Sequence, residues 1–381
     1  MTVGVWQKAL AQEVLEPEKR LVCRFLSGES VFRHGRALIV QLPEGRNTLI
    51  TSWLNGGYRE DLRAVFNSQT IDDVHGHLKI EEYSLYLKVM AERLGLDPER
   101  TSGLSTAVHM DNASIVTKSY QSTSVTAIVT GGVEGNGGRA GDPASYNEVR
   151  GVEPIGGTIV TMLLVNGDMP KHTMARAIMT ATEAKSCALQ QLMAPSRYST
   201  GIATGSGTDQ IAIISDRDSS NRLTDAGKHS KLGELIGKCV IEATTEALNK
   251  HGGLNPASQR DAMVRLKRYR INENDCWTAS AQFPGNIGEA EFRSSLRNLS
   301  REPEMVAAIG SILHIVDEVS WGLIPEEEGN RFGNNMIARL PQILRAGPEG
   351  DSKLMINEAS PILANLVSGL AQMVKEGGAR E

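Results

Sequence analysis

Two glycine-rich stretches carry the clearest chemical signals in this 381-residue sequence. The first is GGVEGNGGRAGD, residues 131–142, with six glycines among the eleven residues 131–141. The second is ATGSGTD, residues 203–209. Glycine permits positive φ angles and lets a ligand approach backbone N–H and C=O groups closely. The two stretches therefore predict a ligand-binding surface built largely from backbone, with a tight turn or β-bulge as the purely structural alternative for each.

Neither stretch has the pattern of a nucleotide-binding loop. A P-loop needs a lysine and a Ser or Thr after its last glycine, whereas Asp142 and Pro143 follow Gly141. A dinucleotide-binding loop leads from a strand into a helix, whereas Gln210 and Ile211 continue as a strand. The hydrolase motif G-x-S-x-G is present only in truncated form, as GSG. A flat, bulky ligand with many amide groups suits such a surface better than a nucleotide.

Polar residues in and around both stretches form the candidate site. The first stretch contributes Asn136, Arg139 and Asp142, and the second contributes Gly205, Gly207, Thr208 and Asp209. Further candidates are Asn166, Glu183, Lys185, His229 and Lys231. Only an imidazole titrates near neutral pH without perturbation, so His229 is a candidate acid or base. A surface or capping role is the alternative for a histidine at the start of a helix.

No metal or other cofactor is predicted. The segment DDVHGH, residues 72–77, offers carboxylates and two histidines, but in a polar loop this spacing is a weak signal for a metal site. The four cysteines, Cys23, Cys187, Cys239 and Cys276, are far apart in the sequence. That spacing indicates neither a disulfide framework nor a zinc site.

The composition is that of an ordinary soluble enzyme. Hydrophobic residues make up 40% of the chain, charged residues 22%, and the formal net charge is −5. The negative charge argues against a nucleic-acid partner. No apolar run approaches 18 residues and the N-terminus lacks the apolar core of a signal peptide, so we expect a cytoplasmic protein without a membrane partner. Association of identical copies is left open.

Hydrophobic periodicity predicts the α+β class. We expect a mixed, largely antiparallel β core flanked by helices, followed by a mainly helical C-terminal region. The nearly continuous apolar run over residues 156–166 indicates a buried central strand. A helix is predicted over residues 81–95, with Leu85, Val89 and Leu94 on one face.

The chain is predicted to contain three segments. Residues 1–100 form a β-rich part with a helix that packs on the core, and residues 101–254 form the core with both glycine-rich stretches. Residues 255–381 form a mainly helical extension of unknown role. Within the core, Glu183 and Lys185 lie on one predicted helix, and because they are two residues apart they cannot share a face.

Five segments in order resemble the adenosylcobinamide amidohydrolase family of corrinoid salvage. They are VTGGVEGNGGRAGDPA (129–144), GGTIVTMLLVN (156–166), RAIMTATEAKSCALQQL (176–192), YSTGIATGSGTDQIAI (198–213) and GKHSKLGELIGKCVIEA (227–243). The resemblance covers roughly residues 20–252. In the first segment the family has a small apolar residue in place of Gly137 or Gly138, a mild departure that leaves the polar residues of the stretch in place.

The resemblance implies hydrolysis of one amide bond, which converts adenosylcobinamide and water to adenosylcobyric acid and aminopropanol. The corrinoid is then the small-molecule partner, and the TGSGTD turn cradles part of the macrocycle or its side-chain amides. Backbone N–H groups of residues 205–208 are natural oxyanion donors. The general base is left open among His229, Glu183 and Asp209. The group that binds a carboxylate product or polarises the carbonyl is left open among Lys185, Lys231 and Arg139.

Three other functions are alternatives. A Thr-nucleophile amidase that cleaves its own chain could use Thr204 or Thr208. A corrinoid-binding protein without catalysis would lack a titratable group beside the glycine-rich stretches, whereas this sequence offers several. Finally, the helical C-terminal region could be the functional unit and bind a partner protein, although apolar helices of this kind more often serve packing.

Overall fold

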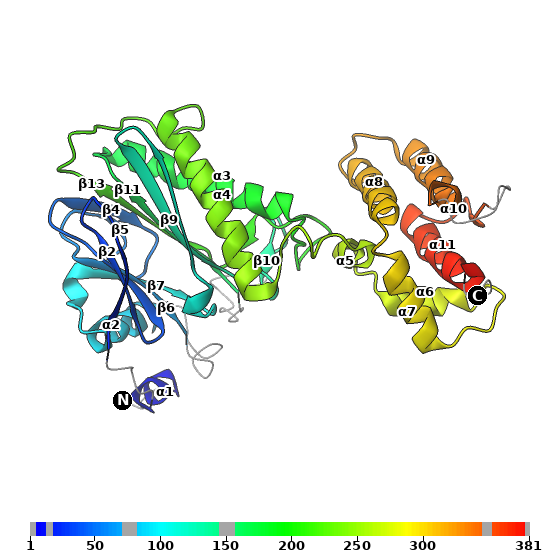
Figure 1. Cartoon of the computed structure of the whole chain (residues 1–381), viewed down its shortest axis with the longest axis horizontal. Coiled ribbons are helices and arrows are strands. Elements are labelled where there is room, and N and C mark those ends of the chain that lie inside the picture. Colours follow the sequence, from blue (N-terminus) through cyan, green and yellow to red (C-terminus); the bar gives the residue numbers. More distant parts are fainter. Residues whose placement is uncertain (1–4, 13–17, 71–81, 145–156, 345–352, 378–381) are drawn as a thin grey trace. The chain divides into compact units, whose positions relative to one another are not determined.

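The computed structural model describes residues 5–12, 18–70, 82–144, 157–344 and 353–377. The chain divides into two compact units, residues 1–255 and 256–381, and each is described by itself (Figure 1). The DDVHGH segment lies outside the described residues. Within the described part of the chain, no helix combines the length and apolarity needed to cross a bilayer.

The N-terminal unit contains two large β-sheets, and strands from its first hundred residues lie in both. The five-stranded sheet has the order β1-β2-β3-β6-β7, and the six-stranded sheet has the order β5-β4-β13-β11-β9-β8. Two of the strand pairs, β6/β7 and β11/β13, are parallel, and the other pairs in these sheets are antiparallel. The strands are β1 (Arg20–Arg24), β2 (Ser30–His34), β3 (Ala37–Gln41), β4 (Arg46–Ile50), β5 (Gly57–Arg59), β6 (Ala64–Gln69), β7 (Thr101–Thr106), β8 (Ser114–Tyr120), β9 (Thr123–Gly131), β11 (Ile159–Val165) and β13 (Gln210–Asp216).

The two sheets face each other, and helices cover their outer faces. Along β11, Ile159 and Leu163 pack with residues of α3 (Lys171–Gln191) and α4 (Lys231–Gly252), whereas Val160 packs between the sheets. The five-stranded sheet packs its other face on α1 (Val5–Gln12) and α2 (Tyr83–Arg93). All seven residues of β11 are buried because both faces of the strand are covered. The α+β class with a mixed, largely antiparallel core is therefore confirmed.

Local sequence explains how the helices begin and end. The side chain of Ser230 caps α4 by accepting a hydrogen bond from the N–H of Gly233 at 3.0 Å. Gly253, at φ +68°, ends the same helix in the left-handed region.

The predicted apolar face of α2 was wrong, since Leu85 is 48% exposed while Tyr86 and the neighbouring Leu87 are fully buried.

The C-terminal unit is helical, as the sequence predicted, and has its own core. Phe292, Ile309 and Leu366 lie at its centre and are fully buried. No strand occurs among its residues at 257–344 and 353–377. Its helices are α5 (Ala262–Leu266), α6 (Glu273–Ser280), α7 (Glu289–Leu299), α8 (Pro303–Ser320), α9 (Glu326–Ala338), α10 (Leu340–Ile343) and α11 (Ile362–Gly377).

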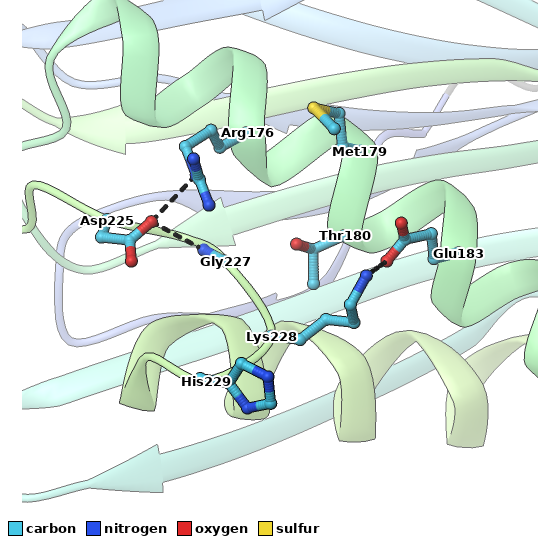
Figure 2. Close-up of a pocket in the computed structure, with 8 residues that line it drawn as sticks. All are labelled: Arg176, Met179, Thr180, Glu183, Asp225, Gly227, Lys228 and His229. Carbon is cyan, nitrogen blue, oxygen red and sulfur yellow. Dashed lines mark hydrogen bonds and ion pairs between the residues drawn. The ribbon is translucent and has the colours of Figure 1, made fainter.

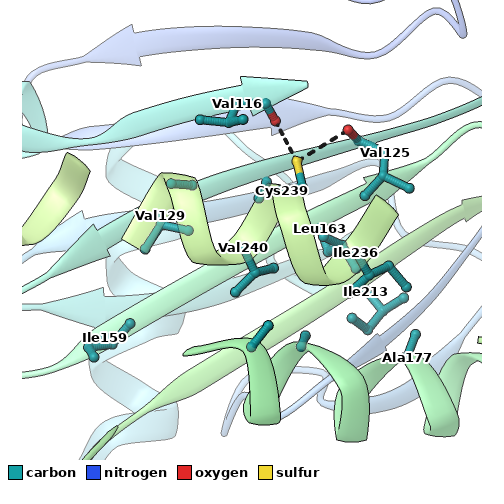
Figure 3. Packing of buried hydrophobic residues seen from close by; sticks show 14 of the residues in the cluster. Val116, Val125, Val129, Ile159, Leu163, Ala177, Ile213, Ile236, Cys239 and Val240 are labelled. Carbon is teal, nitrogen blue, oxygen red and sulfur yellow. Dashed lines mark hydrogen bonds between the residues drawn. The ribbon is translucent and has the colours of Figure 1, made fainter. Parts of the chain in front are cut away.

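Each unit contains a buried cysteine, Cys239 or Cys276, and burial lowers the expected reactivity of its thiol. Cys239 of α4 donates a hydrogen bond to the carbonyl of Val116 at 2.8 Å inside the core (Figure 3). Burial raises the pKa of the Cys239 thiol from 9.0 to about 11 and that of Cys276 to about 12. A rise of two units lowers the thiolate fraction about 100-fold, and the thiolate is the reactive form.

We therefore expect Cys239 and Cys276 to react with an aromatic disulfide reagent at least about 100-fold more slowly than the half-buried Cys187. Peptide mapping after timed quenching measures the rate at each site. In denaturant the rates should converge, because burial no longer separates the thiols. Equal rates for Cys239 and Cys187 in the native chain would contradict the packing described above.

Candidate functional site

The two glycine-rich stretches meet in the folded chain. Short strands β10 (Gly137–Gly138) and β12 (Gly205–Ser206) pair antiparallel, with Gly137 opposite Ser206. The N–H of Thr204 also donates to the carbonyl of Gly138 at 2.9 Å. Residues about 70 positions apart in the sequence therefore form one two-stranded surface.

This surface lies where two parallel strands of the six-stranded sheet begin. Thr158 directly precedes β11 and Asp209 directly precedes β13, and parallel neighbours start at the same edge of a sheet. The N–H of Ile159 donates to Asp209 Oδ1 at 3.0 Å, which ties the two strand starts together. Helix α3 starts after the other end of β11 and contributes Lys185 to this edge.

Asp209 is the centre of a cluster with Lys185 and Ser206. Its Oδ1 accepts hydrogen bonds from Ser206 Oγ at 2.6 Å and from the N–H of Ile159. Its Oδ2 accepts the N–H of Ser206 at 3.1 Å and forms an ion pair with Lys185 Nζ. The Lys185 and Asp209 side chains are only 12% and 18% exposed, so the pair is largely withdrawn from water, where charges interact more strongly.

A second polar group, around Thr208, joins the two glycine-rich stretches to the residues that precede β11. Thr208 Oγ1 donates to the carbonyl of Gly157 at 2.8 Å, and Thr158 Oγ1 donates to the carbonyl of Thr208 at 2.6 Å. Asn136, which is 1% exposed, donates to the same Gly157 carbonyl and accepts a hydrogen bond from Tyr198. The predicted residues Asn136 and Thr208 are thus held inside the paired loops.

Thr158 and Tyr198 belong to this group but were missed by the sequence reasoning. Thr158 has a detectable signal, because it stands directly before a buried strand, as Asp209 does. Tyr198 has no comparable signal: it lies in an irregular segment, and only the folded chain brings its hydroxyl to Asn136.

Arg139 and Asp142 shape the end of the first stretch. The N–H of Arg139 and the hydroxyl of Ser196 both donate to Asp142 Oδ2, the former at 2.7 Å. Burial acts to raise the pKa of Asp142. Hydrogen bonds from Ser196, Ser199 and the Arg139 N–H outweigh that effect, so the pKa of this carboxyl lies below its usual value. Asp142 therefore holds the end of this loop in place by accepting hydrogen bonds. The Arg139 side chain, in contrast, is exposed.

His229 and Glu183 lie in a different place, a shallow hollow of about 240 Å³ beside α3 and the start of α4 (Figure 2). Lys228 Nζ contacts Glu183 Oε2 at 2.6 Å, and Arg176 Nε contacts Asp225 Oδ1 at 2.9 Å. Glu183 and Lys185 do point to different partners, which agrees with the expectation from their spacing. The structure does not bring the His229–Glu183 group into the Asp209 cluster.

Two further predicted residues also lie apart from the glycine-rich stretches. Asn166 follows the opposite end of β11, where its carbonyl accepts a hydrogen bond from Asn221. Lys231 pairs with Glu234 and lies over the Tyr120 ring, 4.6 Å from its centroid. Asn166 and Lys231 therefore make structural contacts at places away from the paired loops.

The paired loops thus combine a hydroxyl, a carboxylate and an ammonium group beside glycines. Such a set can hold an amide carbonyl, polarise it and supply an attacking oxygen. Among the described residues, no three or more His, Cys, Asp or Glu side chains are placed to hold a metal ion.

Comparison with known proteins gives a family match and a relative of this chain. The family model of adenosylcobinamide amidohydrolase matches residues 23–256. The uncharacterized protein MJ1613 of Methanocaldococcus jannaschii is 33% identical over 186 residues, which span 45% of this chain and 72% of that protein.

Two solved structures show weaker likeness. The PH0078 protein from Pyrococcus horikoshii is 12% identical, with a TM-score of 0.29 over 61% of this chain and 83% of that chain. The L-aminopeptidase D-Ala-esterase/amidase from Ochrobactrum anthropi is 10% identical, with a TM-score of 0.27 over 63% of this chain and 81% of that chain.

Proposed function

Because the chain belongs to the adenosylcobinamide amidohydrolase family, we propose that it hydrolyses the amide bond of the aminopropanol arm of adenosylcobinamide. The products are adenosylcobyric acid and aminopropanol. The family match covers residues 23–256, so we assign the chemistry to the N-terminal unit. The scheme uses the chain's own residues and water, without a cofactor.

We place the reaction at the paired glycine loops, around Lys185, Ser206 and Asp209. The observation that supports this choice is the Lys185–Asp209 ion pair, which is largely shielded from water and lies directly against the ATGSGTD turn. Amide hydrolysis needs a polarised carbonyl, an attacking oxygen and a proton for the leaving amine. In this cluster the Asp209 carboxylate lies within hydrogen-bonding reach of both the Lys185 ammonium group and the Ser206 hydroxyl.

The hollow with His229 is the weaker location. Its two ion pairs are exposed, with Lys228 and Glu183 side chains 65% and 49% accessible. Exposed pairs are screened by water and salt and contribute little. We therefore assign the acid-base role to Asp209 rather than to His229 or Glu183.

The test is to incubate the purified full chain with adenosylcobinamide and follow the products by mass spectrometry. Release of aminopropanol and adenosylcobyric acid in equal amounts supports the proposal. Binding of the corrinoid without product would favour the non-catalytic alternative. An intact-mass spectrum that shows cleavage before Thr204 or Thr208 would favour the self-cleaving amidase instead.

A further inference from the structure

We propose that Ser206 is the nucleophile of this site, and this inference rests on the amide hydrolysis proposed above. Ser206 is the central residue of the ATGSGTD turn and lies in β12. Its hydroxyl donates to Asp209 Oδ1 at 2.6 Å and accepts the N–H of Thr208 at 3.3 Å. A nucleophilic hydroxyl needs a group that can accept its proton, and here the proton already points at a carboxylate.

The other hydroxyl groups of the turn have different partners. Thr208 Oγ1 donates to the peptide carbonyl of Gly157, which is no base. Thr204 Oγ1 accepts the N–H of Ala140 at 2.9 Å. Of the three hydroxyls in this turn, Ser206 is thus the one that the structure pairs with a carboxylate. This difference separates Ser206 from both threonines of the self-cleaving alternative.

The two glycines that flank Ser206 have different surroundings. Gly207 is exposed, and a Cβ built there would lie no closer than 3.5 Å to any neighbour, the nearest being Asn136 Oδ1. A Cβ at Gly205 would instead overlap the Asp209 carboxylate and lie 2.7 Å from Lys185 Nζ. Because residue 205 has no side chain, the Lys185–Asp209 ion pair can lie against the backbone next to Ser206.

The proposed reaction passes through an ester on Ser206. Ser206 Oγ attacks the amide carbon, and its proton passes to Asp209 Oδ1. The C–N bond then breaks, the amine leaves with that proton, and an ester joins the acyl group to Ser206. Water hydrolyses the ester, which releases the carboxylic acid and restores the serine hydroxyl. Lys185 stays protonated throughout, offsets the charge on Asp209 and stabilises the negative charge that develops nearby.

A serine-reactive fluorophosphonate tests the inference without relying on the substrate. The full chain should be labelled at Ser206, as identified by peptide mapping. Labelling should disappear in Ser206→Ala and fall at least about 10-fold in Asp209→Asn, which loses the proton acceptor. The control Ser220→Ala changes an exposed serine beyond the far end of β13 and should label normally. Label on Thr204 or Thr208, or none in the turn, would overturn the inference.

Turnover separates this inference from the proposed reaction. Ser206→Ala should lower release of aminopropanol by at least about 10³-fold, and quenched wild-type reactions should contain an acyl adduct on Ser206. If wild type releases aminopropanol but Ser206→Ala retains a tenth of its rate, water attacks directly and the inference fails. If wild type releases none yet Ser206 is labelled, the substrate assignment fails and the nucleophile stands. Ser206→Cys, nearly isosteric, supplies a second variant should the alanine chain not fold.

Discussion

Replacing Lys185 by methionine should lower turnover of adenosylcobinamide by about 10²–10³-fold, while Lys228→Met should change it by less than about threefold. Both lysines pair with a carboxylate and both pairs involve α3. The Lys185–Asp209 side chains are 12% and 18% exposed, whereas those of Lys228 and Glu183 are 65% and 49% exposed. Only the Lys185–Asp209 pair is shielded enough from water for the lysine charge to act strongly on the carbonyl of a bound substrate.

Stability must be measured beside the rate. Removing one member of a shielded ion pair leaves the other charge uncompensated and destabilises the fold. Combining Lys185→Met with Asp209→Asn removes both charges, so the melting temperature should recover part of the loss while turnover stays low. Recovery of turnover in the double variant, or a Lys228→Met defect as large as that of Lys185→Met, would move the reaction centre to the hollow with His229.

Gly205→Ala should abolish at least about 99% of activity, whereas Gly207→Ala should leave kcat within about threefold of wild type. A methyl group at Gly205 has no room beside the Asp209 carboxylate and Lys185 Nζ, so the ion pair must move away from Ser206. At Gly207 the nearest atoms lie at ordinary contact distance, 3.5 Å or more. The two glycines thus form a matched pair, two residues apart on one turn.

Bulk at Gly207 gives a separate outcome. Because this glycine is exposed, Gly207→Val should raise KM by blocking approach of the ligand while changing the melting temperature by no more than about 2 °C. Steady-state kinetics and thermal unfolding of the three variants check both expectations. An active Gly205→Ala chain with normal KM would show that the ion pair does not need this backbone contact.

Much of the N-terminal unit could be predicted because its strands have strong patterns. The apolar run over residues 156–166 is the central strand β11, and the helix around Lys185 lies where periodicity placed it. The strand β6 was missed because polar Asn67 and Ser68 interrupt its apolar run, although both side chains are buried. Asn67 donates to Thr130 of the other sheet, a contact that no local pattern reveals.

The site was predictable in its loops but not in its arrangement. Spacing alone showed that Glu183 and Lys185 point in different directions. Which of them meets Asp209 depends on how α3 packs on the sheet. The imidazole of His229 and its place at the start of a helix make it a candidate, but α4 has 22 residues, about 33 Å of helix, and its far end lies against Glu134 of the first glycine stretch. The fold thus holds His229 far from Glu134.

The central claim, hydrolysis of the aminopropanol amide, is tested most directly by running the reaction in water enriched in oxygen-18. Purified full-length chain and adenosylcobinamide should yield adenosylcobyric acid that carries one labelled oxygen in its new carboxyl group, with unlabelled aminopropanol in equal amount. This result follows whether water attacks the substrate amide or a Ser206 ester. Intact adenosylcobinamide after prolonged incubation with folded protein, or adenosylcobyric acid without the labelled oxygen, would contradict the account.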